Sequence, residues 1–204
     1  MPDRLRPLWD FEDVAATESR LRQQLDHEES DAGRAEVLTQ LARVHSLRDE
    51  FDECEALLQE AEALSDDSLV RVRVDLERGR RLRSSGDGAA AAPVFESAFA
   101  RACEAREFWF AGDAAHMVAI SLPEQMVEWT ERGLALADAE EDASYWAGPL
   151  LNNLGWHYYE AGDYAQALEV FERALEVRRR DPTNPQAITW AEEAVAEARK
   201  ALTS

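Results

Sequence analysis

Residues 148–180, GPLLNNLGWHYYEAGDYAQALEVFERALEVRRR, contain two helical patterns joined by the short turn Ala161-Gly162-Asp163. Apolar and small residues recur at spacings of three and four, which places them on one face of each helix. They are Leu151, Leu154, Gly155 and Tyr158 in the first helix, and Tyr164, Ala167, Phe171 and Ala174 in the second. Small residues allow the two helix axes to approach to about 8 Å, while the large residues fill the adjoining grooves. The stretch therefore predicts a tightly packed helical hairpin.

This pattern resembles the tetratricopeptide repeat (TPR), a helix–turn–helix unit of about 34 residues. Ala174 has equivalents at Gly133, Ala98 and Ala61, which are 41, 35 and 37 residues apart and place a longer connection at 138–144. The chain also resembles bacterial TPR proteins that begin with a similar Leu-Trp-Asp-Phe segment and contain a similar Leu-Leu-Asn-Asn-Leu-Gly-Trp. The resemblance covers residues 35–180. It implies an all-α, right-handed α-α superhelix (a TPR solenoid) of about four helical hairpins plus N- and C-terminal capping helices.

We expect a single domain over residues 1–204. Residues 1–33 form an extended arm and a capping helix, residues 35–180 form the four repeats, and residues 183–204 form a C-terminal capping helix. Caps are expected because the terminal repeats of a solenoid otherwise expose an apolar flank. Pro185 is placed to be the first residue of the last helix.

The charge and the apolar pattern exclude several classes of partner. With 22 basic against 42 acidic residues, the formal charge of −20 argues against nucleic acid and anionic membranes. No run of about 18 apolar residues and no signal-peptide core occurs. Cys54 and Cys103 are the only cysteines and are expected to be reduced thiols. We therefore expect a cytoplasmic protein.

In a stacked array the first helix of each repeat lines a concave inner wall, and the resemblance implies that this wall holds extended peptides or partner helices. The predicted groove stripe is the face of each first helix that is not used for packing, which near the fourth repeat contains Pro149. The predicted peptide-binding residues are Arg43, Arg73, Arg80, Arg83, Trp109, His116, Asn152, Asn153, Trp156 and Tyr159.

The arginines of this stripe allow two interpretations. Residues 71–83, RVRVDLERGRRLR, hold six arginines against Asp75 and Glu77, a local charge of +4. Because a guanidinium matches the geometry of a carboxylate, they form an anion site for an acidic peptide or a chain terminus in the first interpretation. In the second they neutralise nearby acidic residues of the chain itself. Those residues are Glu36, Glu53, Glu55 and Glu60.

The aromatic residues of the stripe are likewise open to two interpretations. Trp109 and Trp156 are either exposed anchors for a partner or buried side chains that fill gaps left by Gly112 and Pro149. Asn153 matches an asparagine of the carboxylate-clamp TPRs, which hold the terminal carboxylate of a peptide. The full clamp is not expected, because the residues at its other positions differ. Thr39, Glu77 and Asp113 stand where lysine, asparagine and arginine occur in that group.

The sequence gives little support for catalysis, and an enzymatic role that uses His116 and His157 is only a remote alternative. The four histidines form no HExxH pattern, no Cys/His set has zinc spacing, and no glycine-rich phosphate loop occurs. We expect no enzyme, no cofactor and no metal, but a protein-interaction scaffold that binds a peptide or partner helix in its concave groove. The arginines of the stripe allow this partner to carry acidic groups. The alternative is a self-assembling structural protein, such as a homodimer, whose groove is filled by its own N-terminal arm with Leu8 and Trp9.

Overall fold

The computed structural model describes residues 3–180 and 184–203, and within these ranges it contains helices and no strand. The α-helices are α1 Val14–His27, α2 Asp31–Ser46, α3 Phe51–Leu64, α4 Ser68–Ser84, α5 Gly88–Ala105, α6 Phe108–Ser121, α7 Met126–Ala139, α8 Ala147–Glu160, α9 Tyr164–Arg180 and α10 Pro185–Leu202. Three 3-10 helices accompany them: η1 Arg6–Leu8, η2 Pro123–Gln125 and η3 Glu141–Trp146. The first two residues of the expected arm, the residues 181–183 before the expected closing helix, and Ser204 lie outside the described residues.

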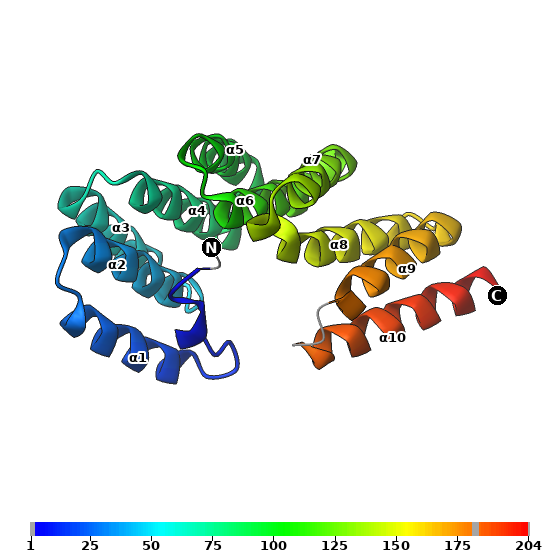
Figure 1. Ribbon diagram of the computed structural model, residues 1–204, viewed down its shortest axis with the longest axis horizontal. Helices are drawn as coiled ribbons and strands as arrows, with labels where there is room; N and C mark the ends of the chain where they lie inside the picture. The colour runs from blue at the N-terminus through cyan, green and yellow to red at the C-terminus, as the bar shows by residue number, and fades with distance from the viewer. Residues whose placement is uncertain (1–2, 181–183, 204) are drawn as a thin grey trace.

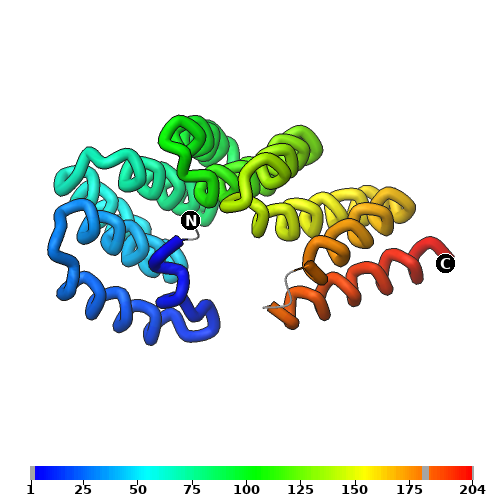
Figure 2. Tube along the Cα trace, viewed as in Figure 1, coloured from blue at the N-terminus to red at the C-terminus, as the bar shows by residue number. Residues whose placement is uncertain are grey.

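Successive helices pair as antiparallel hairpins, which stack into an arch (Figure 1). The hairpins are α2–α3, α4–α5, α6–α7 and α8–α9, with α1 and α10 at the two ends. The first helices of neighbouring hairpins contact one another, as α2 does with α4, and α6 with α8. In the Cα trace, α4 and α6 lie on the inner side of the arch, beneath α5 and α7 (Figure 2). The expected all-α solenoid is confirmed.

A glycine of the inner helix meets a phenylalanine of the outer helix in two hairpins. A Cβ added at Gly79 would lie 2.5 Å from the ring of Phe95, and one added at Gly155 would lie 2.4 Å from the ring of Phe171. Both phenylalanines are buried. The absent side chain of the glycine therefore creates the slot that each ring fills, which is how small and large residues produce the close helix pairing.

In three of the four hairpins the turn contains a residue with a positive φ. Gly86 and Gly162 follow α4 and α8 with φ of 92° and 80°. The first hairpin has no glycine in its turn, and there Asp49 takes a φ of 61°. Short polar side chains tolerate this left-handed conformation better than most, so the turn closes without glycine.

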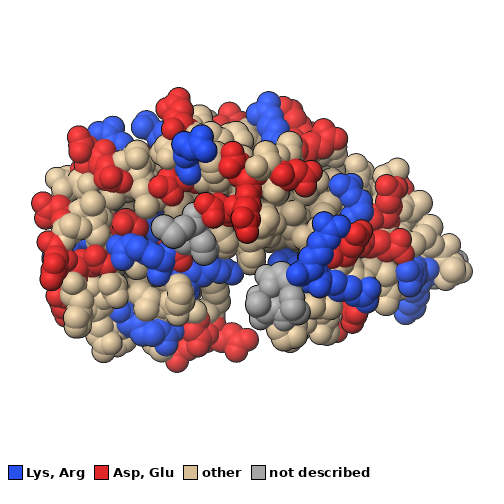
Figure 3. All heavy atoms as spheres, viewed as in Figure 1, with Lys and Arg blue, Asp and Glu red and all other residues tan. Residues whose placement is uncertain are grey.

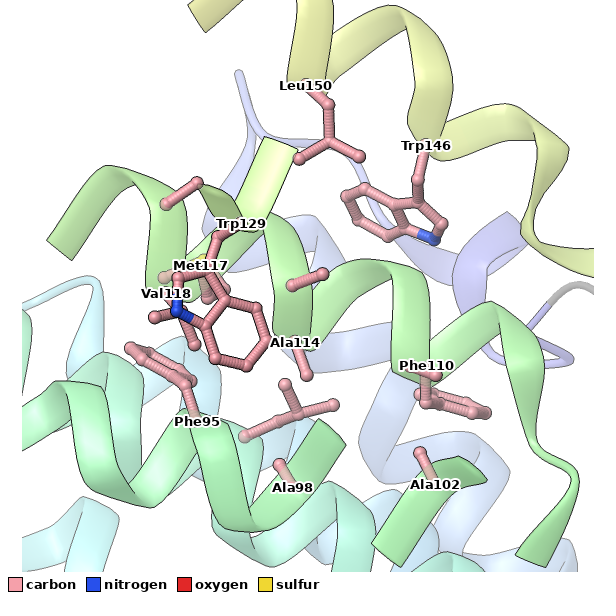
Figure 4. Close-up of a cluster of buried hydrophobic side chains, with 14 of the residues drawn as sticks. Phe95, Ala98, Ala102, Phe110, Ala114, Met117, Val118, Trp129, Trp146 and Leu150 are labelled. Atoms are coloured by element: carbon pink, nitrogen blue, oxygen red, sulfur yellow. The ribbon is translucent and has the colours of Figure 1, made fainter. Parts of the chain in front are cut away.

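The largest core cluster joins the middle hairpins and contains Phe95, Trp129, Trp146 and Leu150 (Figure 4). Trp146 comes from η3, in the connection that the sequence predicted to be long. A Cβ added at Gly112 would lie 2.4 Å from Cδ1 of Trp146. The expectation that Trp109 fills the gap at Gly112 is therefore wrong, because a neighbouring tryptophan from the connection occupies it.

Candidate binding groove

The concave face has two parts, defined by the helices that line them. The N-terminal half of the groove is lined by α2, α4 and α6, and the C-terminal half by α8 and α10. Figure 3 shows a hollow at the open side of the arch, with basic side chains on both sides of it and acidic side chains scattered over the rest of the face. Among the residues that the structure describes, no helix is long and apolar enough to cross a membrane.

The chain's own N-terminal arm lies in the N-terminal half of the groove. Asp3 accepts hydrogen bonds from both Nη atoms of Arg73, the bond to Nη1 measuring 3.2 Å. Arg73 is only 2% exposed, and its Nε also lies 3.2 Å from Oε2 of Glu36. Its guanidinium carbon lies 4.5 Å from the ring centroid of Phe110. Arg73 is therefore neutralised inside the chain and is not open to a partner while the arm is in place.

Three further arm residues contact three different parts of the groove. Leu5 is 1% exposed and belongs to the apolar cluster built by α1 to α4. Arg6 donates to the hydroxyl of Tyr145 at 2.9 Å, and its guanidinium lies 4.9 Å from the centroid of that ring. Trp9 donates through Nε1 to Oε1 of Gln40 at 2.9 Å. The arm thus touches α2, α4 and η3 through side chains of different chemistry.

Alternating charges cross the inner helices beneath the arm. Arg80 donates to Glu77 at 2.6 Å and to Asp113 at 2.5 Å. These carboxylates raise the pKa of Arg80 above its ordinary value, even though burial opposes the shift. Arg43 lies farther away, 4.0 Å from Glu77, and its guanidinium lies 5.1 Å from the ring of Trp9. Burial and the charge of Arg80 lower the pKa of Arg43.

His116 continues this row toward α8. Its Nε2 lies 2.7 Å from the side-chain nitrogen of Asn153, which can only donate, so Nε2 accepts and Nδ1 carries the proton. Burial, opposed by Asp113 and reinforced by Arg80 and Arg83, lowers the pKa of His116 to about 4. The imidazole is therefore neutral at physiological pH. This polar pair fixes α6 to α8 where the two halves of the groove meet.

The two halves differ in the space that they leave. In the N-terminal half, a cavity of about 240 Å³ lies between the arm and the inner helices. Its lining includes Arg6, Trp9, Arg43, Arg80, Trp109, Asp113, His116 and Tyr145. The arm itself forms one wall, so this cavity exists only while the arm is docked.

The C-terminal half holds an open pocket of about 470 Å³ between α8 and α10. Its lining includes Tyr145, Pro149, Asn152, Asn153, Trp156, Arg178 and Trp190. Trp190 is 59% exposed, and Trp156 is half-buried, with its ring 5.1 Å from that of Phe171. The pocket therefore combines accessible aromatic rings with amides that both donate and accept hydrogen bonds.

A further hollow of about 530 Å³ lies between α9 and α10, outside this concave pocket. Four of its charged residues are already engaged with one another. Arg179 pairs with Glu192 at 2.7 Å and Arg199 with Glu172 at 2.5 Å. Because the ionic groups are paired across the helix interface, we assign this hollow to helix packing.

The structure brings most of the predicted site residues into these two pockets and leaves three outside them. Arg43, Arg80, Trp109 and His116 line the cavity under the arm, whereas Asn152, Asn153 and Trp156 line the pocket between α8 and α10. Arg73 is buried beneath Asp3, Arg83 is exposed at the end of α4, and Tyr159 packs between Trp156 and Tyr164. Trp109 is 7% exposed and packs on Tyr145, in agreement with the interpretation that it is buried.

The arginine cluster follows the second of the two interpretations, with different partners. Arg78 and Arg81 pair with Glu55, and Arg78 also pairs with Glu62. Of the four acidic residues expected from the sequence, Glu36 and Glu55 take this role. Asp3, Glu62, Glu77 and Asp113 complete the neutralisation. Four of the six arginines, at positions 73, 78, 80 and 81, therefore belong to an internal ionic network.

Sequence reasoning missed several groove residues outside the first helices, among them Arg6, Tyr145, Arg178 and Trp190. Arg6 belongs to the arm, Tyr145 to η3, Arg178 to an outer helix and Trp190 to the terminal helix. None of them lies on the first-helix stripe from which the site was predicted. The one available signal was the pair Tyr145-Trp146 in the long connection, since adjacent aromatic residues in a connection indicate packing or contact.

Comparison with known proteins agrees with this geometry. Residues 122–180, which hold η2 to α9, match the tetratricopeptide repeat family. A search of curated proteins finds no match. The crystal structure of BtubC (BKLC) from P. vanneervenii is similar in fold, with a TM-score of 0.65 and 17% sequence identity over 98% of this chain and 85% of that chain. Residues 122–180 therefore carry a tetratricopeptide repeat, and the fold of the described residues is that of a stacked helical-repeat protein.

Proposed function

We propose that the protein is a non-catalytic interaction scaffold that binds an extended peptide or a partner helix in the C-terminal half of its groove. Tetratricopeptide repeats form scaffolds for protein–protein interaction, and the proposal assigns that role to one surface. The observation that carries it is the pocket of about 470 Å³ between α8 and α10, with Trp156 and Trp190 in its lining.

The chemistry of this pocket suits a peptide. Its volume falls within the range of about 300–1,000 Å³ in which protein ligand sites are found. Tryptophan, tyrosine and arginine are the residues that most often dominate binding energy at interfaces, and the lining supplies Trp190, Tyr145 and Arg178. The amide of Asn152 can donate to a peptide carbonyl and accept from a peptide N–H.

A micromolar complex requires about 8 kcal/mol. Covering each large ring contributes up to about 3 kcal/mol, and each neutral hydrogen bond about 1 kcal/mol. Two covered rings and two hydrogen bonds from Asn152 therefore supply a favourable binding free energy of about 8 kcal/mol. The entropy lost on association is not yet subtracted from this sum. A partner must consequently cover Trp190 and Trp156 together.

The test captures partners from a native lysate with the full chain and with Trp190→Ala and Asn152→Ala variants. Val127→Ala is the matched control, because Val127 is an exposed apolar residue on the outer helix α7. We expect capture of the same partner by the wild type and the control, and its loss with both groove variants. If both groove variants are folded, as judged by circular dichroism, and capture the partner as well as the wild type does, the partner does not bind in the pocket between α8 and α10.

Self-assembly is the second candidate, favoured by the fit of the arm to the groove. The arm residues that dock in the same chain would make identical contacts in a neighbouring copy if two chains exchanged arms. Light scattering of the full chain across a concentration series tests this candidate. A dimer whose fraction falls in an Arg6→Glu variant supports it, whereas a monomer at all concentrations excludes it.

A further inference from the structure

Residues 3–9 occupy the N-terminal half of the groove in the manner of a bound peptide. Asp3, Leu5, Arg6 and Trp9 each dock in a separate place. Between them, Arg4 pairs with Glu28 and Glu36, Leu8 packs on the apolar cluster, and Pro7 is exposed. The link from the arm to α1, residues 10–13, is exposed throughout. The backbone-to-backbone hydrogen bonds of the arm are local, such as those from Leu8 N to Leu5 O and from Trp9 N to Arg6 O. One bond to α1 joins the side chain of Arg20 to the carbonyl of Leu8 at 2.8 Å.

We propose that the arm is a displaceable ligand of this half of the groove, and that a segment of another protein with the pattern Asp-x-Leu-Arg-x-x-Trp takes its place. Each position of the pattern follows from one contact. The aspartate accepts hydrogen bonds from Arg73, and the leucine packs into the apolar cluster that includes residues of α2 and α4. The arginine lies on the ring of Tyr145, and the indole N–H reaches Gln40.

The groove keeps its own balance of charge when the arm leaves. Arg73 retains Glu36, whose Oε2 lies 3.2 Å from its Nε. Arg80 retains Glu77 and Asp113. A buried arginine without any acidic neighbour would be strongly destabilising, but here each one keeps a carboxylate from an inner helix. Release of the arm therefore exposes a binding surface on a folded protein.

Tethering makes the arm a strong competitor. A short flexible link gives a docked segment an effective concentration in the millimolar range. A free peptide that binds the empty groove with a Kd of about 1 µM would then be weakened by about 1,000-fold in the wild-type chain. Only a partner that binds more tightly, or one present in excess, occupies this half of the groove. This inference concerns a different surface and ligand from those of the proposed function.

The test uses the full chain and a labelled synthetic peptide of residues 1–12. In a Leu5→Glu/Arg6→Glu variant the docking of the arm is weakened, while every residue of α2, α4, α6 and η3 is unchanged. We expect the peptide to bind this variant at least 100-fold more tightly than the wild type, measured by fluorescence anisotropy. A Leu5→Glu/Arg6→Glu peptide is the matched control and should bind neither chain.

Hydrogen exchange of the wild type gives a second measurement that needs no weakened arm. We expect the amides of Leu8 and Trp9 to exchange far faster than those in the middle of α4, because the arm opens without global unfolding. Peptide binding that is equally weak in both chains, or arm amides that exchange only with global unfolding, would overturn the inference. Arm-dependent dimers of the wild type in light scattering would show that a second copy is the occupant and would also overturn it. Loss of capture by Trp190→Ala tests the other surface and is independent of these outcomes.

Discussion

The two halves of the groove are built from the same repeat but offer opposite surfaces. Arg43, Arg80, His116 and Trp156 occupy the corresponding position of four successive inner helices. The first two are charged and lie among carboxylates, the third is a neutral imidazole, and the fourth is a half-buried indole. The residue at this one repeat position is thus charged where the groove is filled by the arm and aromatic where the groove is open. The helices that carry these residues pack in the same way in both halves.

The largest expected difference between the halves concerns Arg73. Replacing it in Arg73→Met removes a buried cation and leaves Asp3 and part of Glu36 without their partner. Breaking a buried ion pair from one side costs about 3–5 kcal/mol. We expect the free energy of unfolding, measured by urea denaturation, to fall by about that amount.

Arg178 provides the control in the other half. It is half-buried beside the open pocket, and its guanidinium carbon lies 5.6 Å from the ring of Tyr145. We expect Arg178→Met to change the free energy of unfolding by about 0–1 kcal/mol, as for other partly exposed charges. Equal losses in the two variants would contradict the view that only the N-terminal half depends on buried charge.

Regular features of the sequence predicted the fold, whereas contacts between distant segments could not be predicted. The hairpins follow from periodic positions such as Gly155 and Phe171, which require only local spacing. Asp3 and Arg73 are separated by 70 residues, and Arg6 and Tyr145 by 139. No periodicity connects such pairs, because they form only after stacking brings the arm to the inner wall. For the same reason the stripe predicted many residues of the two pockets but not which half would be filled.

The junction between the halves is expected to respond to pH. His116 has its pKa lowered to about 4, chiefly by burial, whereas an ordinary histidine titrates near 6.5. Between these values the unfolded chain binds a proton that the folded chain does not, so stability present above pH 6.5 is lost as the pH falls toward 4. From pH 7 to pH 5 the loss attributable to His116 is about 2 kcal/mol.

Urea denaturation at pH 7 and pH 5 measures this loss, and His116→Asn removes it while keeping a polar side chain beside Asn153. The difference between the two proteins isolates His116 from the many carboxylates that titrate in the same range. If the pH dependence of the variant matches that of the wild type, the buried neutral imidazole is not the cause.

The smallest effect is expected for substitutions inside the helical hairpins, which compare the packing of the two halves directly. In both Gly79→Ala and Gly155→Ala the new Cβ meets a phenylalanine ring, at 2.5 Å and 2.4 Å respectively. Overpacking costs about 1–3 kcal/mol, and alanine recovers up to about 1 kcal/mol of helix propensity, which leaves a net loss of about 1 kcal/mol at each site in thermal or urea unfolding. Adding Phe95→Leu or Phe171→Leu to the corresponding variant should cost less than the sum of the single changes, because the two positions share one slot. If both variants lose the same free energy of unfolding, the two halves differ only in the residues that line the groove. If only one variant is destabilised, the packing inside the hairpins differs between the halves as well.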